Sequence, residues 1–179
     1  MIAKFLFTKI FRWELEGIFP AKNKMLLAVG PHTHWFDFIL AVLVRSFLKE
    51  PIHFLGKKEL FTPITNRLFR YWGGVPVDRT GKNNTVGQAI NYFKINPVFR
   101  LAIAPEGTRK KVNQFKSGFY YIAHTAQIPI LPVVFDFGKR KMILHPLYYT
   151  TGDKKKDVLK IEKYFKGIQG KIPKYSFNP

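Results

Sequence analysis

Two histidines and an aspartate stand close together in PHTHWFDF, residues 31–38, which leads into the apolar run Phe38–Val44. In one regular helix, the spacing of His32 and Asp37 would point their side chains apart, since each residue turns the helix by about 100°. If a helix begins between them, the carboxylate can accept a hydrogen bond from one imidazole nitrogen and leave the other free as a general base. This is a catalytic triad without its serine, so the nucleophile would be a hydroxyl group of the substrate.

His34 allows a second interpretation, because two histidines beside an acid can form part of a metal site. The other histidines are scattered along the chain, and no third ligand follows at a typical spacing. We therefore favour a capping or packing role for His34 and expect no metal.

A second polar group, PEGTR, follows the apolar run LAIA and covers Pro105–Arg109. Gly107 allows a sharp turn, and Thr108 can donate a hydrogen bond or cap a helix. Arg109 can bind a phosphate group through two parallel hydrogen bonds. An ordinary polar loop is the alternative.

Further cations stand at the ends of other apolar runs. GGVPVDR, residues 73–79, ends in Arg79, for which a surface ion pair is the alternative. Lys58 follows the run PIHFLG, and Lys116 follows the PEGTR segment. A solvated basic face is the alternative for both lysines.

Short apolar runs that predict strands alternate with amphipathic segments that predict helices. The strands are expected at residues 24–30, 51–56, 73–79, 99–107, 130–137 and 141–149. The helices are expected at residues 35–48, 61–71, 85–93, 115–126 and 153–168. This alternation is typical of an α/β fold, a largely parallel central sheet flanked by helices. Ligands of such sheets bind at the carboxyl ends of the strands, where the polar residues above stand.

The N-terminal residues 1–13 place Lys4, Lys9 and Arg12 on one side of a helix and most of their apolar residues on the other. A short basic amphipathic helix with Phe and Trp is typical of a membrane interface. Packing against the protein's own core is the alternative. We divide the chain into an interfacial helix with its connector, residues 1–20, and a single domain, residues 21–179.

The charge balance is strongly basic, with 30 Lys and Arg against 11 Asp and Glu, a net charge of +19. Such a charge attracts nucleic acid, anionic lipid or an acidic protein. A nucleic-acid-binding module would interleave aromatic and basic residues or carry a recognisable motif. This chain shows neither, so we expect no nucleic-acid partner.

Composition also excludes some site types and predicts the relation to a membrane. The chain has no cysteine, which excludes disulfides, thiolate metal sites and cysteine nucleophiles. Phe38–Val44, its longest apolar run, is far shorter than the ~20 residues that span a bilayer. The N-terminal cations interrupt any signal-peptide core. We therefore expect neither a transmembrane helix nor export.

Four sequence blocks occur in a fixed order, namely H-x4-D at 32–37, GGVPVDR at 73–79, PEGTR at 105–109 and IPILPV at 128–133. Their order resembles the glycerolipid acyltransferases, and within them the acyl-glycerol-3-phosphate (lysophosphatidic acid) acyltransferase group. KKEL at 57–60 and FKSG at 115–118 resemble flanking signatures of the same family. The resemblance covers residues 32–133 and implies an acyltransferase-like fold.

The resemblance implies that His32 is the general base and Asp37 its orienting partner. His32 would deprotonate the free hydroxyl of a lysophospholipid, which attacks the thioester of an acyl carrier protein or coenzyme A. No metal, cofactor or covalent enzyme intermediate is implied. Substrate-binding roles fall on Arg79, Glu106, Gly107, Thr108, Arg109, Lys58 and Lys116.

Several positions depart from the family pattern, namely Pro31, His34, Pro76, Val77, Ala104 and Lys110. None of them removes a catalytic group, but together they leave the acceptor open. Lysophosphatidate, another lysophospholipid or a lyso-aminolipid are the alternatives, and a non-catalytic basic lipid-binding protein is a further one. We expect a peripheral enzyme on the cytoplasmic face of the inner membrane, held there by its basic terminal segments.

Overall fold

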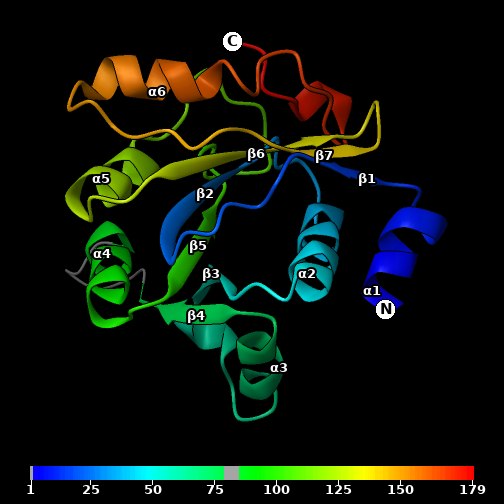
Figure 1. Cartoon of the computed structure of the whole chain (residues 1–179), viewed down its shortest axis with the longest axis horizontal. Coiled ribbons are helices and arrows are strands. Elements are labelled where there is room, and N and C mark those ends of the chain that lie inside the picture. The colour runs from blue at the N-terminus through cyan, green and yellow to red at the C-terminus, as the bar shows by residue number, and fades with distance from the viewer. Residues whose placement is uncertain (1, 79–84) are drawn as a thin grey trace.

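The computed structural model describes residues 2–78 and 85–179, which form one seven-stranded sheet with helices on both faces (Figure 1). The strand order is β1-β7-β6-β2-β5-β3-β4. Only the pairing of β6 with β7 is antiparallel among the described strand pairs. The predicted α/β fold with a largely parallel sheet is confirmed.

The strands are β1 (Glu14–Glu16), β2 (Lys24–Gly30), β3 (Ile52–Lys57), β4 (Gly74–Val77), β5 (Phe99–Ile103), β6 (Ile130–Asp136) and β7 (Lys141–Leu144). The α-helices are α1 (Ile2–Phe5), α2 (Phe36–Leu48), α3 (Asn66–Tyr71), α4 (Thr85–Ile95), α5 (Gly118–Thr125) and α6 (Lys154–Glu162). Shorter helical turns are η1 (Leu6–Ile10), η2 (Lys58–Leu60) and η3 (Pro173–Tyr175).

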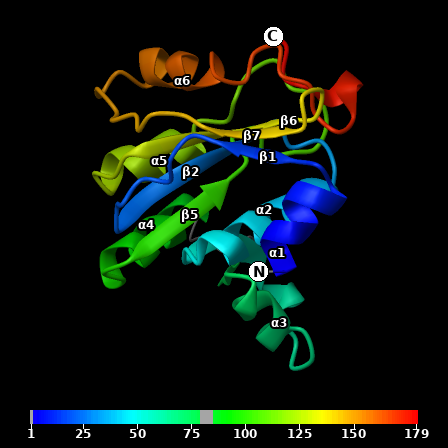
Figure 2. The same ribbon diagram turned by 45° about the vertical axis from the view of Figure 1, so that its right-hand side comes forward.

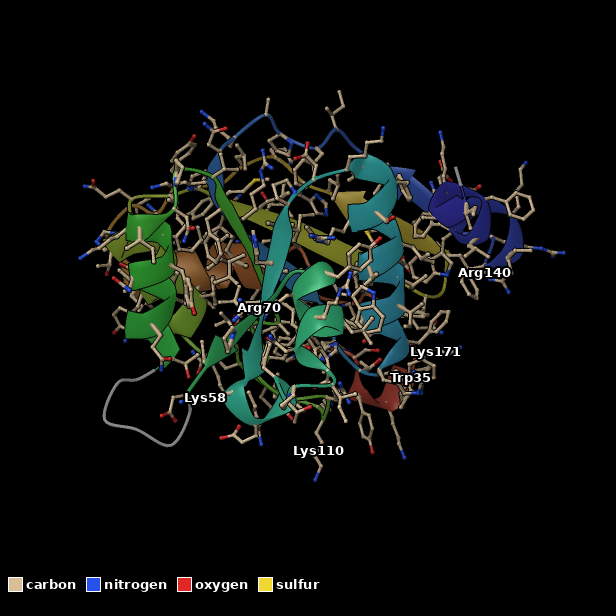
Figure 3. All side chains as sticks on the ribbon, turned by 90° about the horizontal axis from the view of Figure 1, so that it is seen from below. Trp35, Lys58, Arg70, Lys110, Arg140 and Lys171 are labelled. Atoms are coloured by element: carbon tan, nitrogen blue, oxygen red, sulfur yellow. The ribbon has the colours of Figure 1, made fainter. Side chains whose placement is uncertain are left out.

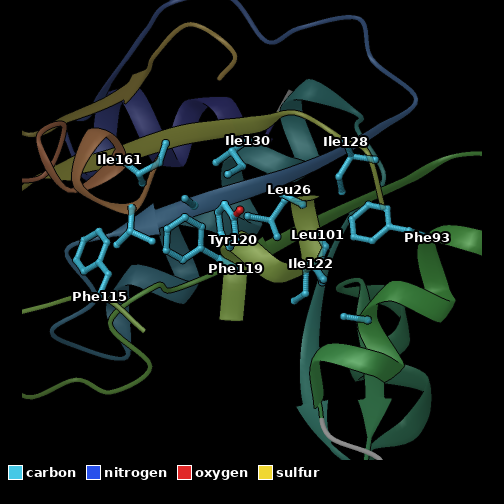
Figure 4. Close-up of a cluster of buried hydrophobic side chains, with 14 of the residues drawn as sticks. Leu26, Phe93, Leu101, Phe115, Phe119, Tyr120, Ile122, Ile128, Ile130 and Ile161 are labelled. Carbon is cyan, nitrogen blue, oxygen red and sulfur yellow. The ribbon is translucent and has the colours of Figure 1, made fainter. Parts of the chain in front are cut away.

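β2 lies inside the sheet, and its side chains alternate between two hydrophobic cores. Leu26 and Ala28 belong to the core that α4, α5 and α6 cover (Figure 4). Met25 and Leu27 belong to the core on the opposite face, beneath α2 and the N-terminal helix. Because both faces are covered, the strand is an almost continuous apolar run.

The N-terminal helix packs through one face only. It consists of α1 and the π-helical turn η1, shorter than the expected residues 1–13. Phe7 is fully buried, and its ring lies 5.5 Å from that of Phe47 on α2, whereas Ile2, Phe5 and Ile10 remain exposed. The next residues, expected as a connector, include the edge strand β1.

Several other elements are shorter than expected, β4, β5 and α5 among them. The helix expected at 61–71 begins only at Asn66, because a turn held by the hydroxyl of Thr65 on the carbonyl of Leu60 precedes it. β7 ends at Leu144, two residues before Pro146, which has no N–H for a strand ladder. α6 ends at Glu162 rather than at 168.

No helix in residues 2–78 and 85–179 combines the length and the apolarity that a membrane crossing would need.

The carboxyl edge of the sheet is the edge at which β2, β3, β4 and β5 end. β2 and β5 are parallel neighbours, with Ala28 opposite Ile103. The segments that follow them, residues 31–35 and 104–117, therefore meet at this edge.

Candidate active site

The His32 and Asp37 side chains form a hydrogen-bonded pair at the carboxyl edge. His32 follows β2, Asp37 lies in the first turn of α2, and the helix begins between them, in agreement with the helix expected at residues 35–48. Nδ1 of His32 lies 3.0 Å from Oδ2 of Asp37. The aspartate side chain is 2% exposed and the histidine side chain 26%, so the imidazole reaches solvent from a buried anchor.

Oδ2 of Asp37 holds the turn as well as the imidazole. It accepts hydrogen bonds from the backbone N–H of Thr33, at 2.9 Å, and of His34, at 3.0 Å. Three donors on one oxygen fix the turn and the ring together, which preorganises the pair.

His34 caps the start of α2. Its Nδ1 accepts a hydrogen bond from the backbone N–H of Phe36 at 3.1 Å, and its ring lies 5.3 Å from that of Trp35. Across the described ranges, no three His, Cys, Asp or Glu side chains come together in a way that could hold a metal. The geometry supports the capping interpretation of this residue.

Glu106 lies behind His32 rather than in the open site. Its side chain is buried, and Oε2 accepts a hydrogen bond from the backbone N–H of His32 at 2.7 Å. Burial raises the pKa of Glu106 to about 7. The His32 N–H bond and the His32 charge lower that pKa in part, and the nearby Asp37 raises it. The carboxyl group of Glu106 thus titrates near neutral pH, and its hydrogen bond holds the backbone at His32.

Arg109 contacts the second imidazole nitrogen. Its Nε–H donates to Nε2 of His32 over 3.2 Å, and its side chain is exposed. Since Nε2 accepts here, the imidazole proton lies on Nδ1 and is donated to Asp37. Nε2 therefore carries the lone pair that a general base needs.

The loop from 105 to 110 is tightly folded. Gly107 has φ +64°, and a Cβ added there would lie 2.7 Å from Cδ of Lys116, so the Lys116 side chain crosses the glycine. Oγ1 of Thr108 accepts from the N–H of Lys110 at 3.3 Å. The loop thereby presents the cations of Arg109 and Lys116 at the carboxyl edge.

The other two predicted cations are Lys58 and Arg79, of which the structure describes only Lys58. Lys58 begins η2 directly after β3, at the same edge of the sheet but without a contact to His32 among the described interactions (Figure 3). Arg79 lies outside the described residues. The residues that the structure brings together are His32, Asp37, Glu106, Gly107, Thr108, Arg109 and Lys116.

A contact with the C-terminal segment was not predicted from the sequence. Thr33 is buried, and its Oγ1 accepts a hydrogen bond from the N–H of Ile172 at 3.1 Å. A Cβ at Gly30 would lie 3.2 Å from the ring of Phe165, so the end of β2 is also covered by this segment. The partners are 139 residues apart in the Thr33 contact, and no local pattern signals such a pair.

Comparisons with known proteins show the family and the fold of this chain. A family model described as Acyltransferase matches residues 12–136. The 1-acyl-sn-glycerol-3-phosphate acyltransferase of Escherichia coli K12 is 27% identical over 127 residues, which cover 67% of this chain and 50% of that protein. The same-named protein of Haemophilus influenzae is 26% identical over 147 residues, covering 76% and 59% respectively.

A solved structure shares the fold. The 1-acyl-sn-glycerophosphate (LPA) acyltransferase PlsC from Thermotoga maritima superposes with a TM-score of 0.60 at 21% identity, covering 90% of this chain and 77% of that chain. The present chain spans about half the length of the Escherichia coli relative. Since the family model covers more than half of the sequence and contains both members of the His32–Asp37 pair, the chain belongs to the acyltransferase family.

Proposed function

We propose that this chain transfers a fatty acyl group from an acyl thioester to the free hydroxyl of a lysophospholipid, with lysophosphatidate as the favoured acceptor and phosphatidate as the product. The observation that carries the proposal is the imidazole of His32, whose Nδ1 is held by Asp37 and whose Nε2 is an acceptor for the exposed Arg109. The names of the relatives support the choice of acceptor.

The reaction needs one base that returns its proton. The acceptor hydroxyl gives its proton to Nε2 of His32 as its oxygen attacks the thioester carbonyl. Asp37 stabilises the imidazolium that forms. The tetrahedral intermediate then collapses to the ester, and the departing thiolate takes the proton from Nε2 and leaves as a thiol. Positioning of the hydroxyl and the thioester against Nε2 supplies much of the acceleration.

The cations around Nε2 suit an anionic acceptor. Arg109 lies on the loop beside His32, the Lys116 side chain packs over Gly107 of that loop, and Lys58 lies on the same edge. On binding, the guanidinium of Arg109 turns from Nε2 to the phosphate, and the substrate hydroxyl takes its place at Nε2. Arg79 is proposed as a further phosphate ligand from the sequence block that contains it.

Donor, cofactor and location complete the proposal. The donor is an acyl carrier protein or coenzyme A thioester, and the reaction uses no metal or other cofactor. We place the enzyme peripherally on the cytoplasmic face of the inner membrane. The exposed apolar residues of the N-terminal helix, Ile2, Phe5 and Ile10, alternate with Lys4 and Lys9 and suit a lipid interface.

The proposal is tested by acyl transfer from both kinds of thioester to a panel of lyso-lipids, with purified protein and two histidine variants. His32→Ala should lower the rate by about 10²–10⁴-fold, the usual contribution of a general base. His124→Ala is the matched control, because this exposed histidine contacts Thr150 and Tyr120 and not the site. Full activity in His32→Ala would overturn the mechanism. No transfer to any acceptor would leave a lipid-binding protein.

A further inference from the structure

The α3 lobe, residues 58–72, projects from the body of the protein. It contains η2, a turn and α3, and it connects the carboxyl end of β3 to the start of β4. In Figures 1 and 2, α3 extends beyond the sheet and the other helices. Its position raises the question of what its outer side contacts.

Aromatic contacts fix the inner side of the lobe to the body. The ring of Phe69 lies 5.7 Å from that of Phe61 and 6.2 Å from that of Trp72. Trp72 in turn lies 5.9 Å from Phe38 of α2. The lobe is therefore anchored, and its outer residues have defined positions.

The outer side of the lobe is apolar. Ile64 is 91% exposed and Tyr71 is 75% exposed, and Leu60 and Leu68 are exposed as well. Four large apolar side chains are thus exposed within one short segment. Exposed apolar side chains concentrated in this way mark sites of contact with a protein or a membrane.

The same segment is basic. It contains the exposed cations Lys58, Arg67 and Arg70 and a single acid, Glu59. In the part of the chain that the structure describes, none of these three cations forms an ion pair. A partner that is both apolar and negatively charged fits this surface, and an anionic lipid bilayer has that chemistry.

The lobe begins at the edge that carries His32, because Lys58 directly follows the carboxyl end of β3. Trp35 is 57% exposed and stands between His34 and the start of α2. Lys110 follows Arg109 in the loop. In Figure 3, Trp35, Lys58 and Lys110 lie toward one margin of the molecule. An exposed tryptophan among cations is typical of a membrane interface.

We propose that the α3 lobe and Trp35 form a lipid-contacting surface that seats the carboxyl edge on an anionic bilayer. Ile64, Leu68 and Tyr71 insert among the acyl chains, and the neighbouring cations bind lipid phosphates. A lysolipid then reaches His32 without leaving the bilayer. This part of the inference rests on the proposed function, whereas the lipid contact itself does not.

The first test uses fluorescence at single positions. Because the chain has no cysteine, Ile64→Cys can be labelled at one site with an environment-sensitive dye. Ile18→Cys is the matched control, since Ile18 is 89% exposed in the connector between β1 and β2, at the opposite edge of the sheet. Vesicles of phosphatidylglycerol and phosphatidylcholine should shift the emission to the blue at position 64 and not at position 18. A shift only at position 18 would overturn the inference.

The second test measures binding by co-sedimentation with the same vesicles. Ile64→Glu should weaken binding by about tenfold or more, because a charge replaces a side chain that inserts into lipid. Ile18→Glu should bind like the unmodified chain. Equal binding by both variants would exclude the lobe from the contact. An unmodified chain that does not bind, and forms a dimer that Ile64→Glu dissociates, would assign the patch to a second copy.

Activity separates this inference from the proposed function. Ile64→Glu should lose transfer to a lysolipid embedded in vesicles but keep transfer to a short-chain, monomeric lysolipid. Equal loss on both substrates would contradict a role in lipid contact alone. If the unmodified chain transfers no acyl group but binds vesicles through position 64, the proposed function fails and the lipid surface stands.

Discussion

Nε of Arg109 donates a hydrogen bond to Nε2 of His32 across 3.2 Å, and the two residues are 77 positions apart in the chain. This bond occupies the nitrogen that accepts the substrate proton in the proposed reaction. In that proposed reaction, Arg109 exchanges one partner for another, the imidazole for the phosphate of the acceptor. The proposal thus makes Arg109 the link between head-group binding and exposure of the base.

Replacement of Arg109 should lower the rate of transfer to acceptors that carry a phosphate more than to acceptors that do not. A charge-assisted hydrogen bond contributes about 2 kcal/mol, so Arg109→Ala should lower kcat/KM for lysophosphatidate by roughly thirtyfold. Transfer to an uncharged monoacylglycerol should change little. Arg109→Lys keeps the charge but loses the planar guanidinium. Its kcat/KM for lysophosphatidate should lie between those of the unmodified chain and of Arg109→Ala. Steady-state kinetics with both acceptors measure the effect. An equal loss of kcat/KM for both acceptors would show that Arg109 does not bind the phosphate.

Asp37 should control the position of the imidazole proton. In Asp37→Asn, the new amide can donate to Nδ1 of His32 and move the ring proton to Nε2, where it blocks proton acceptance. We expect kcat to fall by about 10²–10⁴-fold. The unfolding free energy should fall by about 1–3 kcal/mol, since Oδ2 accepts three hydrogen bonds in the present turn.

Asp153→Asn is the matched control for this substitution. Asp153 caps α6 and accepts a hydrogen bond from the N–H of Lys156 at 3.0 Å, away from His32. This variant should keep full activity, because asparagine caps a helix as well as aspartate does. A similar activity loss in both variants would point to a general effect on folding.

Gly107 should tolerate no side chain. Gly107→Ala should lower the unfolding free energy by about 1–2 kcal/mol, because a non-glycine residue is strained at φ +64°. Its Cβ also displaces the Lys116 side chain. Gly167→Ala separates the two effects, since Gly167 has φ +76° with no atom within 4 Å of the added Cβ. Thermal unfolding should show a loss in both variants, and acyl transfer should fall only in Gly107→Ala. Normal transfer in Gly107→Ala would show that the position of Lys116 is unimportant.

Stability should depend on pH through Glu106. Burial raises the pKa of its carboxyl from 4.5 to about 7, so the folded chain keeps a proton that the unfolded chain releases. The stability contributed by the protonated form is complete below about pH 4.5 and is lost as the pH rises through about 7. The difference between the folded and unfolded pKa of Glu106 corresponds to about 3 kcal/mol of unfolding free energy.

The near-isosteric variant Glu106→Gln isolates this effect. Glutamine keeps an oxygen for the N–H of His32 but does not titrate. The unfolding free energy of the unmodified chain minus that of Glu106→Gln should decrease between about pH 5 and about pH 8, as urea titrations can show. A difference that stays constant over this range would mean that Glu106 ionises equally in the folded and unfolded chain.

Much of the local structure follows from the sequence. Because side chains alternate along a strand and recur every 3.6 residues along a helix, apolar runs predict the elements themselves. The run 24–30 coincides with β2, and α2 begins between His32 and Asp37, as expected. The pairing of these two side chains depends only on a turn of a few residues, so their spacing together with the expected start of the helix made it possible to anticipate.

Other contacts were decided by the tertiary structure. The sequence does not state that β5 lies beside β2, and this adjacency alone brings the carboxyl group of Glu106 behind His32 and Arg109 onto Nε2. The support of Thr33 by Ile172 likewise joins segments 139 residues apart. Periodicity encodes which face of an element is buried, but not which element covers it. That choice depends on how all the strands and helices pack together, and so only the folded chain reveals it.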